Sequence, residues 1–422
     1  MKVAGTVRVP GDKSITHRAL LLGALARGES HVGGALTSLD ARSSARVLRA
    51  LGARISPLRA GEMVTVRGGG KLRRPEGVLD CGNSGTTARL LLGLLAGHPF
   101  KATLTGDSSL RRRPMRRVTA PLREMGARFE EGAGDGLPLT IRGGTLRPLR
   151  YAMPVSSAQI KSALLLAGVA AGVDVDLREP GGRSRDHTER MLRHFGFAVT
   201  ESEGWISFRP GGRITPFDLQ VPGDPSSAAF MVAAAVLADG GTLRVAGVGV
   251  NPTRTGFLGV LERMGAPVAV EDEVDHFGEP IADLIVSPAG LRATEILPAE
   301  IPALIDEIPM LAVLASRASG TTVFRQVGEL RVKESDRLGL IAENIRRVGG
   351  QAEVQGDDLL VTGGEAPPRG SVRTAGDHRL AMAFAVLGTL PGARVRIDDL
   401  ACSAVSFPGF AAALRAVARR AA

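Results

Sequence analysis

The sequence has few cysteines and few aromatic residues. Only Cys81 and Cys402 occur in 422 residues, which gives no disulfide framework and no metal-ligand spacing. Aromatic residues make up 4% of the chain, with one Trp and one Tyr, so stacking platforms for single-stranded nucleic acid are scarce. The formal charge of +10 points to anionic partners, but the basic residues are dispersed along the chain. We therefore expect anionic ligands and no nucleic acid partner.

Long hydrophobic runs are also missing. No stretch of about 18 apolar residues occurs, which predicts that the chain does not span a membrane. Residues 1–9 alternate like a β-strand and lack the apolar core of a signal peptide. The composition, 44% hydrophobic and 23% charged, is that of a globular protein large enough for two domains. We expect a cytoplasmic protein with no membrane partner.

Several common catalytic signatures are missing as well. The glycine run at 68–70 is not followed by Lys-Ser/Thr at a helix start, so a nucleoside triphosphate site is not indicated. No group of His, Cys and Asp has the spacing of a catalytic metal site. No local Ser-His-Asp hydrolase signature is present either. The sequence therefore predicts no metal.

What the sequence does contain is one pattern that recurs six times. Each copy has a polar cluster, an Ala/Leu-rich helix, a strand and a second, amphipathic helix, whose apolar stripe is seen in Val118, Leu122 and Met125. The first helices are apolar nearly all round, which is typical of buried helices. A degenerate sixth copy closes the chain at 414–418. The other five second helices end at a glycine suited to the position after a helix, namely Gly52, Gly126, Gly196, Gly265 and Gly349.

The six copies predict an α/β protein of two domains with three copies each. A boundary is expected in the Pro-containing stretch 221–225. The N-terminal strand has no copy of its own, and we expect it to pair with the C-terminal half. The predicted domains are residues 12–224, and residues 1–11 together with 225–422.

A polar cluster precedes each buried helix, and its Ser, Asn or Asp residues suit helix N-caps. For one cluster alone, capping is the favoured interpretation. Helix N-termini also carry free N–H groups and positive dipole ends, so six of them together predict an anion site. The fourth cluster has the weakest claim and is expected to be mostly scaffold. The clusters lie at 11–18, 81–86, 156–161, 224–227, 306–307 and 376–379.

Arginine-rich clusters begin three of the amphipathic helices, at 110–115, 183–186 and 331–337. Arginine opposes the dipole at a helix N-terminus, so its presence favours recognition of phosphate or carboxylate over a stabilising role. The alternative is a solvated face with internal pairs such as Lys333 with Asp336. Two carboxylates, Asp306 and Glu334, lie among the cationic clusters and suit general acid–base chemistry. Pro114 is expected at the first position of its helix.

These motifs resemble those of the 5-enolpyruvylshikimate-3-phosphate synthases, and the resemblance extends over essentially the whole chain. The run Arg-Val-Lys-Glu-Ser-Asp-Arg at 331–337 is the most specific of them. The resemblance implies a two-domain inside-out α/β barrel in which each domain has three βαβαββ units. The other matching segments are Gly-Asp-Lys-Ser-Ile-Thr-His-Arg at 11–18, Gly-Asn-Ser-Gly-Thr at 82–86, Arg-Arg-Pro-Met at 112–115 and Asp-His-Arg at 377–379.

The resemblance also implies a reaction. The enolpyruvyl group of phosphoenolpyruvate would pass to the 5-hydroxyl of shikimate 3-phosphate with release of phosphate, without a metal or organic cofactor, in a monomer. Asp306 would take the hydroxyl proton, and Glu334 with Lys13 would protonate the methylene carbon. The phosphoenolpyruvate ligands would be Lys13, Gly85, Thr86, Arg113, Gln159, Arg337 and Arg379. The shikimate 3-phosphate ligands would be Ser14, Arg18, Ser157, Gln159, Asp306 and Lys333.

Three positions depart from familiar members. Ala158 follows Ser157 where a second Ser is common, Ser184 and Arg185 occupy a segment that often holds a Tyr, and a Lys usual before Phe407 is missing from the segment 404–406. These changes affect the expected phosphate contacts and leave the proton-transfer residues in place.

Two alternatives compete with this interpretation. A UDP-N-acetylglucosamine enolpyruvyl transferase would have the same size and fold as this chain. Members of that family typically have Lys-Asn where this chain has Lys13-Ser14. They also usually carry a Cys in the loop at 110–115, where this chain has none. A non-catalytic scaffold that binds anionic partners would not require Asp306 and Glu334 among the basic clusters.

Overall fold

A computed structural model describes residues 1–131 and 134–419, and the chain in it divides into two compact units. The terminal unit holds Met1–Pro10, Pro222–Asp275 and the chain from Pro280 onward. The central unit holds Gly11–Val221 and the short turn His276–Glu279. Each unit has its own hydrophobic core. The chain therefore starts in one unit, completes most of the other, and then returns.

The central unit contains three four-stranded sheets with one shared pattern. In each sheet the first two strands are parallel and the other pairings are antiparallel. In strand order the sheets are β14 (Asp218–Gln220), β3 (Arg27–Gly33), β5 (Val64–Gly69) and β4 (Arg54–Ile55); β6 (Leu79–Asp80), β7 (Lys101–Thr105), β9 (Leu139–Arg142) and β8 (Arg128–Glu131); and β10 (Leu149–Ala152), β11 (Val175–Arg178), β13 (Trp205–Arg209) and β12 (Ala198–Ser202).

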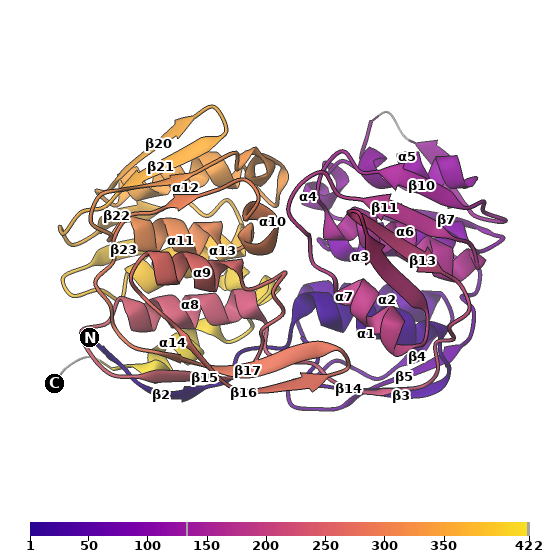
Figure 1. The fold of residues 1–422 in the computed structure, drawn as a ribbon, viewed down its shortest axis with the longest axis horizontal. Helices are drawn as coiled ribbons and strands as arrows, with labels where there is room; N and C mark the ends of the chain where they lie inside the picture. The colour runs from indigo at the N-terminus through magenta and orange to yellow at the C-terminus, as the bar shows by residue number, and fades with distance from the viewer. Residues whose placement is uncertain (132–133, 420–422) are drawn as a thin grey trace. The chain divides into compact units, whose positions relative to one another are not determined.

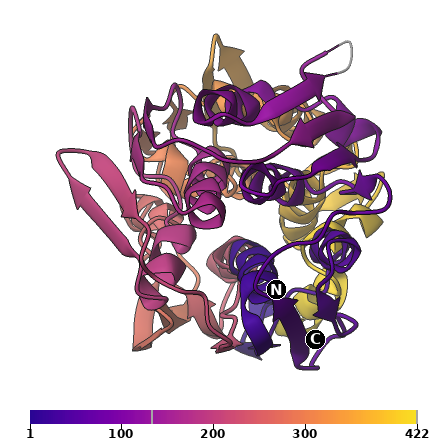
Figure 2. The ribbon, with the colours of Figure 1, turned by 90° about the vertical axis from the view of Figure 1, so that its right-hand side faces the viewer.

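The helices of the central unit fall into two kinds. Three carry apolar residues, mostly Ala and Leu, on nearly all of their faces and are therefore buried on most sides. Among them, α3 packs against both α6 and α1 (Figures 1 and 2). The buried helices are α1 (Lys13–Leu25), α3 (Gly85–Ala96) and α6 (Ala158–Ala171). The others, mostly amphipathic, are α2 (Leu39–Ala50), α4 (Ser108–Arg111), α5 (Arg116–Met125) and α7 (His187–His194).

The terminal unit has two four-stranded sheets, each with a parallel pair at one edge, and two small sheets. The N-terminal strand β2 pairs with β15 in parallel, so the expected pairing of the first strand with the C-terminal half is confirmed. In strand order the sheets are β16 (Ala269–His276), β17 (Glu279–Val286), β15 (Leu243–Gly249) and β2 (Gly5–Val7); β18 (Glu295–Ile296), β19 (Thr321–Phe324), β21 (Asp358–Thr362) and β20 (Gln351–Gln355); β22 (Arg369–Val372) and β23 (Arg394–Ile397); and β1 (Lys2–Val3) and β24 (Ala418–Arg419).

Three buried helices again form the middle of the terminal unit. They are α8, α11 and α13, and each contacts the other two (Figure 1). The helices of this unit are α8 (Pro225–Val236), α9 (Gly256–Arg263), α10 (Ile301–Leu304), α11 (Ile308–Ala315), α12 (Arg337–Arg347), α13 (His378–Leu387) and α14 (Phe410–Val417), with short 3₁₀ turns η1 (Gly328–Val332) and η2 (Ala401–Val405).

The glycine stops of the amphipathic helices are confirmed in all five copies. Each glycine has a positive φ, between 77° and 113°. In each copy the glycine N–H bonds a carbonyl three residues back, and the next N–H reaches five residues back, as Gly126 and Ala127 do to Arg123 and Leu122. This double hydrogen bond satisfies the last carbonyls of the helix and requires a residue that tolerates the left-handed conformation. The recurring glycine is therefore a structural feature of the fold.

The helix starts follow the predicted caps in four of six buried helices. Asp12, Ser84, Asp224 and Asp377 each accept a hydrogen bond from a backbone N–H of the first turn. Ser157 and Glu307 occupy the cap position but make no such bond. Because these two side chains do not cap their helices, they are available for other contacts.

One local prediction was wrong, and one pair offered by an alternative is not formed. Pro114 does not begin its helix, because α5 starts at Arg116, after the N–H of Met115 has bonded the carbonyl of Asp135. The alternative of a solvated charged face offered a pair of Lys333 with Asp336, but the Asp336 carboxylate lies 3.7 Å from Arg331 instead.

Candidate functional site

The predicted site residues lie in two clusters, one in each unit. In the central unit, Lys13, Ser14 and Arg18 occupy the first turns of α1, whose start is fixed by the Asp12 carboxylate on the N–H of Ile15 at 2.8 Å. The Lys13 ammonium lies 3.2 Å from the Asp40 carboxylate. This helix start places two cations and a hydroxyl together.

Arg18 is 3% exposed, and within residues 1–131 and 134–419 its hydrogen bonds go to neutral acceptors. Its guanidinium bonds the Ser14 carbonyl at 2.9 Å, the Thr188 hydroxyl at 2.7 Å and the Ser162 hydroxyl at 2.6 Å. Desolvation lowers the pKa of Arg18 to about 10. A buried cation without a carboxylate in hydrogen-bonding contact is suited to an anionic ligand.

The next predicted residues, Gly85, Thr86, Arg113 and Gln159, lie at or near the start of α3. The Gln159 amide donates to the Thr86 hydroxyl at 3.0 Å and accepts from Arg89 at 2.6 Å. A Cβ added at Gly85 would lie 2.9 Å from Arg89 Nη1 and 3.2 Å from Arg113 Nη1. Gly85 therefore allows two guanidinium groups to approach the helix N-terminus, where backbone N–H groups also favour anions.

A buried lysine holds the loop that leads into α7. The Lys161 ammonium bonds Glu179 at 3.0 Å and Glu189 at 2.8 Å, and it donates to the Ser184 carbonyl at 3.0 Å. Burial opposes its charge, but the two carboxylates raise the pKa of Lys161 above its usual value. The loop held in this way carries Arg185, which donates to the Ser14 hydroxyl at 3.5 Å. Ser157 lies at the start of α6, and its carbonyl accepts from the Lys161 N–H.

The hydroxyl network behind these helix starts contains a neutral histidine. Thr87 donates to Ser84, so Ser44 must donate its own proton to Thr87, and His17 Nδ1 must donate to Ser44. Desolvation, then the charges of Lys13 and Arg18, lower the pKa of His17 to about 3. His17 is therefore a neutral packing partner of the cationic cluster.

In the terminal unit, one buried arginine joins three carboxylates. Arg337, 1% exposed, bonds Asp377 at 2.7 Å, Asp306 at 3.2 Å and Glu334 at 2.5 Å. Burial opposes the charge, but the three carboxylates raise the pKa of Arg337. Arg337 in turn lowers the pKa of Asp377 against the effect of desolvation. Asp306 and Glu334, both singled out from the sequence, are therefore held by the same guanidinium.

Arg379 lies against the same group. It donates to the Asp306 carbonyl at 3.1 Å, and its Nη2 lies 3.5 Å from the Asp306 carboxylate. Its Nη1 lies 3.9 Å from the Glu307 carboxylate. Lys333 is half-buried; desolvation lowers the pKa of its ammonium below the usual value, and the Asp306 carboxylate opposes that shift. This cluster combines two carboxylates suited to proton transfer with three cations.

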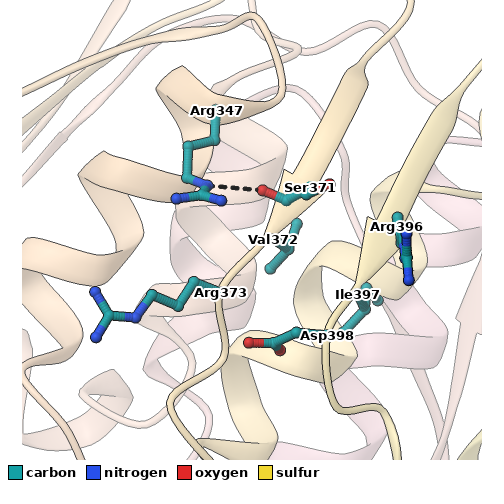
Figure 3. Close-up of a pocket in the computed structure, with 7 residues that line it drawn as sticks. All are labelled: Arg347, Ser371, Val372, Arg373, Arg396, Ile397 and Asp398. Carbon is teal, nitrogen blue, oxygen red and sulfur yellow. Dashed lines mark hydrogen bonds between the residues drawn. The ribbon is translucent and has the colours of Figure 1, made fainter.

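Other features of the described chain lie away from these clusters. A cavity of about 390 Å³ opens beside β22, β23 and α12, where the Arg347 guanidinium bonds the Ser371 carbonyl (Figure 3). None of the predicted site residues lines it. Within residues 1–131 and 134–419, no three His, Cys, Asp or Glu residues group as metal ligands, and no helix is long and apolar enough to cross a membrane. Both cysteines are free thiols, and desolvation raises the pKa of each to about 12.

The structure adds residues that the sequence did not single out. Arg89 and Arg185 approach the central cluster, and Asp377 and Glu307 approach the terminal one. Asp377 and Arg185 lay inside noted motifs, so their type and place were visible in the sequence. Arg89 lies mid-helix, and nothing local marks it.

The chain was compared with known proteins. The family model for EPSP synthase (3-phosphoshikimate 1-carboxyvinyltransferase) matches residues 1–414. A 3-phosphoshikimate 1-carboxyvinyltransferase from Alkalilimnicola ehrlichii is 48% identical over 409 residues, covering 96% of this chain and 91% of that protein. One from Gloeobacter violaceus is 49% identical over 413 residues, covering 97% and 95%. The solved structure of EPSP synthase from Acinetobacter baumannii is similar with a TM-score of 0.85 and 38% identity, covering 99% of this chain and 96% of that one.

Proposed function

The chain belongs to the EPSP synthase family, and from this premise we propose how its residues share the reaction. The chain is a transferase of the shikimate pathway: it passes the enolpyruvyl group of phosphoenolpyruvate to shikimate 3-phosphate. Both substrates are multiply anionic, in keeping with the formal charge of +10. The steps below are the proposal.

The substrates are bound by residues of both clusters. Phosphoenolpyruvate is held by cations and by the start of α3, and shikimate 3-phosphate by the start of α1 together with Lys333. The hydrogen bonds of Arg18 to neutral groups, which a phosphate could replace or join, support its assignment to the phosphate of shikimate 3-phosphate. The proposed phosphoenolpyruvate ligands are Lys13, Gly85, Thr86, Arg113, Gln159, Arg337 and Arg379. The proposed shikimate 3-phosphate ligands are Ser14, Arg18, Ser157, Gln159, Asp306 and Lys333.

The chemistry is addition followed by elimination. Asp306 takes the proton of the 5-hydroxyl while the hydroxyl oxygen attacks C2 of phosphoenolpyruvate. Glu334, together with Lys13, gives a proton to the methylene carbon. In the second step that carbon returns a proton to Glu334 and the C2–O bond to phosphate breaks. The leaving phosphate carries away the proton that Asp306 took from the hydroxyl, so both acids return to their starting states. Positioning and charge stabilisation supply most of the rate enhancement in such a reaction.

One observation carries this assignment. Arg337 bonds both Asp306 and Glu334 and thereby fixes the two proposed proton carriers relative to one another. A non-catalytic anion-binding scaffold has no use for two acids beside its cations, because each acid repels the ligand. The paired acids therefore favour the enzyme over the scaffold.

The finer architecture and state belong to the same proposal. We propose that each unit is the inside-out barrel of three βαβαββ units implied by the resemblance, over residues 12–224 and over 1–11 with 225–422. We further propose a monomer in the cytoplasm that needs no metal or organic cofactor. Light scattering after size exclusion tests whether the protein is a monomer. Full activity after chelation tests whether it works without a metal.

Phosphate release tests the proposed function directly. We expect phosphate from phosphoenolpyruvate only when shikimate 3-phosphate is also present. Release that depends instead on UDP-N-acetylglucosamine would assign the chain to the other enolpyruvyl transferase activity. No release with either acceptor would support the scaffold.

A further inference from the structure

The start of α8, in the fourth copy of the repeat, is joined to the terminal cluster by buried polar contacts. The Ser226 hydroxyl donates to a carboxylate oxygen of Glu307, although the two residues are 81 positions apart in the sequence. Glu307 follows Asp306 directly and occupies the cap position of α11, where it makes no capping bond with its side chain. Its carboxylate is instead directed to Ser226 and to Arg379.

Arg254 sets the direction of the Ser226 hydroxyl. Its guanidinium donates to the Ser226 oxygen at 2.9 Å and to Asp224 at 3.1 Å. A serine hydroxyl has one proton, and an oxygen that already accepts from a guanidinium is free to donate that proton elsewhere. The Ser226 proton therefore goes to Glu307. Asp224 also accepts from the Ser226 N–H at 2.7 Å, which fixes the backbone of the same residue.

All of these side chains are buried, so their contacts are not replaced by water. Arg254, Glu307 and Ser226 are 2%, 2% and 4% exposed. A buried carboxylate needs donors and opposite charge, and Glu307 Oε1 has the Ser226 hydroxyl as donor and the Arg379 guanidinium at 3.9 Å as opposite charge. Arg379 in turn contacts Asp306 through the backbone carbonyl and the carboxylate.

We propose that Arg254, Ser226 and Glu307 form a positioning relay that holds Arg379 in place for phosphoenolpyruvate. The fourth copy, expected from the sequence to be mostly scaffold, thus acts on the reaction through other residues. This inference rests on the proposed role of Arg379 in binding phosphoenolpyruvate. It assigns no contact between the relay and either substrate.

Ser226→Ala removes the middle of the relay. We expect KM for phosphoenolpyruvate to rise about tenfold, which corresponds to one ordinary polar contact, with kcat and KM for shikimate 3-phosphate within about twofold. Ser226→Thr keeps the hydroxyl and should restore most of the lost affinity. Glu307→Gln keeps an acceptor for Ser226 but removes the charge beside Arg379, so it should raise the same KM.

Ser227→Ala is the matched control. Ser227 is the next residue on the same helix turn, is 3% exposed, and has no hydrogen bond to Glu307 in the described part of the chain. We expect its kinetics to equal those of the wild type. Equal effects of the two serine variants, or a loss in Ser226→Ala confined to kcat, would overturn the relay, as would failure of Ser226→Thr to recover.

A crystal structure of Ser226→Ala separates the relay from the proposed function. The relay predicts that the Arg379 guanidinium leaves its position between Asp306 and Glu307, whereas Ser227→Ala leaves it unchanged. An unmoved Arg379 would refute the relay even in an active enzyme. A wild type that releases no phosphate with shikimate 3-phosphate would refute the proposed function, and the position of Arg379 would still decide the relay.

Discussion

Two buried arginines, Arg18 in the central unit and Arg337 in the terminal unit, have opposite surroundings. Arg18 donates to one carbonyl and two hydroxyls, and desolvation lowers its pKa to about 10. Arg337 bonds three carboxylates, which raise its pKa despite burial. The carboxylates near Arg18, among them Glu189 and Asp12, act on it only through space, whereas those around Arg337 are hydrogen-bonded to it. This difference supports the proposed binding of a substrate phosphate by Arg18, and it adds to the proposed role of Arg337 the holding of Asp306 and Glu334 in place.

The largest expected effect comes from an acid that Arg337 holds. Asp306→Asn keeps the shape of the side chain but removes the proposed base, so kcat should fall by about 10²- to 10⁴-fold, with substrate KM values changed only a few-fold. Steady-state phosphate release measures both. Asp357→Asn, an exposed carboxylate paired with Arg331, is the control and should match the wild type. Near-normal turnover of Asp306→Asn would remove Asp306 from its role.

Arg337→Gln tests the arginine that is hydrogen-bonded to three carboxylates. Removing the cation takes away the guanidinium shared by the buried Asp377 and the partly buried Asp306 and Glu334, and we expect the free energy of unfolding to fall by about 3–5 kcal/mol. Urea unfolding measures the loss. Arg347→Gln is the control on the same helix: Arg347 is exposed and paired with the partly buried Glu343, and its loss should stay below about 1 kcal/mol. Similar losses in the two variants would contradict the special place of Arg337.

A smaller effect concerns His17, the neighbour of Arg18 on α1. Its pKa is about 3 in the folded protein against 6.5 in the unfolded chain, so the unfolded state binds more protons between these values. Stability should therefore fall by about 1.4 kcal/mol for each pH unit lost below pH 6.5 on account of this residue. His17→Gln should remove that part of the slope.

The difference in the pH slope of the unfolding free energy between wild type and His17→Gln separates the contribution of His17 from that of the titrating carboxylates. His31→Gln is the control with the opposite sign. Asp218 and Glu29 raise the pKa of the exposed His31, so its contribution is present at low pH and is lost as pH rises through the raised pKa. Identical pH slopes for the wild type and His17→Gln would show that His17 is not held neutral.

Features set by neighbouring residues could be predicted from the sequence. The glycine stops, most of the helix caps and the α/β character follow from local pattern, because a helix end and its hydrogen bonds involve residues a few positions apart. The motif at 331–337 also pointed to Glu334 and Arg337, which do contact one another. Pro114 was misplaced because a contact with Asp135, some twenty residues later, sets where α5 begins.

Features set by distant pairs could not be predicted. The Ser226–Glu307 hydrogen bond joins two copies of the repeat, and neither residue differs locally from an ordinary helix start. The opposite surroundings of Arg18 and Arg337 likewise depend on partners such as Thr188, 170 positions from Arg18, and Asp377, 40 positions from Arg337. A single sequence identifies the charged residues of a site but does not show which charges are already balanced.

Calorimetric titration of shikimate 3-phosphate into Arg18→Gln tests the central claim most directly. The removed cation is the one whose hydrogen bonds go to neutral groups, so we expect affinity to fall at least about tenfold while the free energy of unfolding changes by less than about 2 kcal/mol. Arg209→Gln, which removes a partly exposed cation paired with Asp176 in the same unit, should bind as the wild type does. Unchanged affinity in Arg18→Gln would contradict the account.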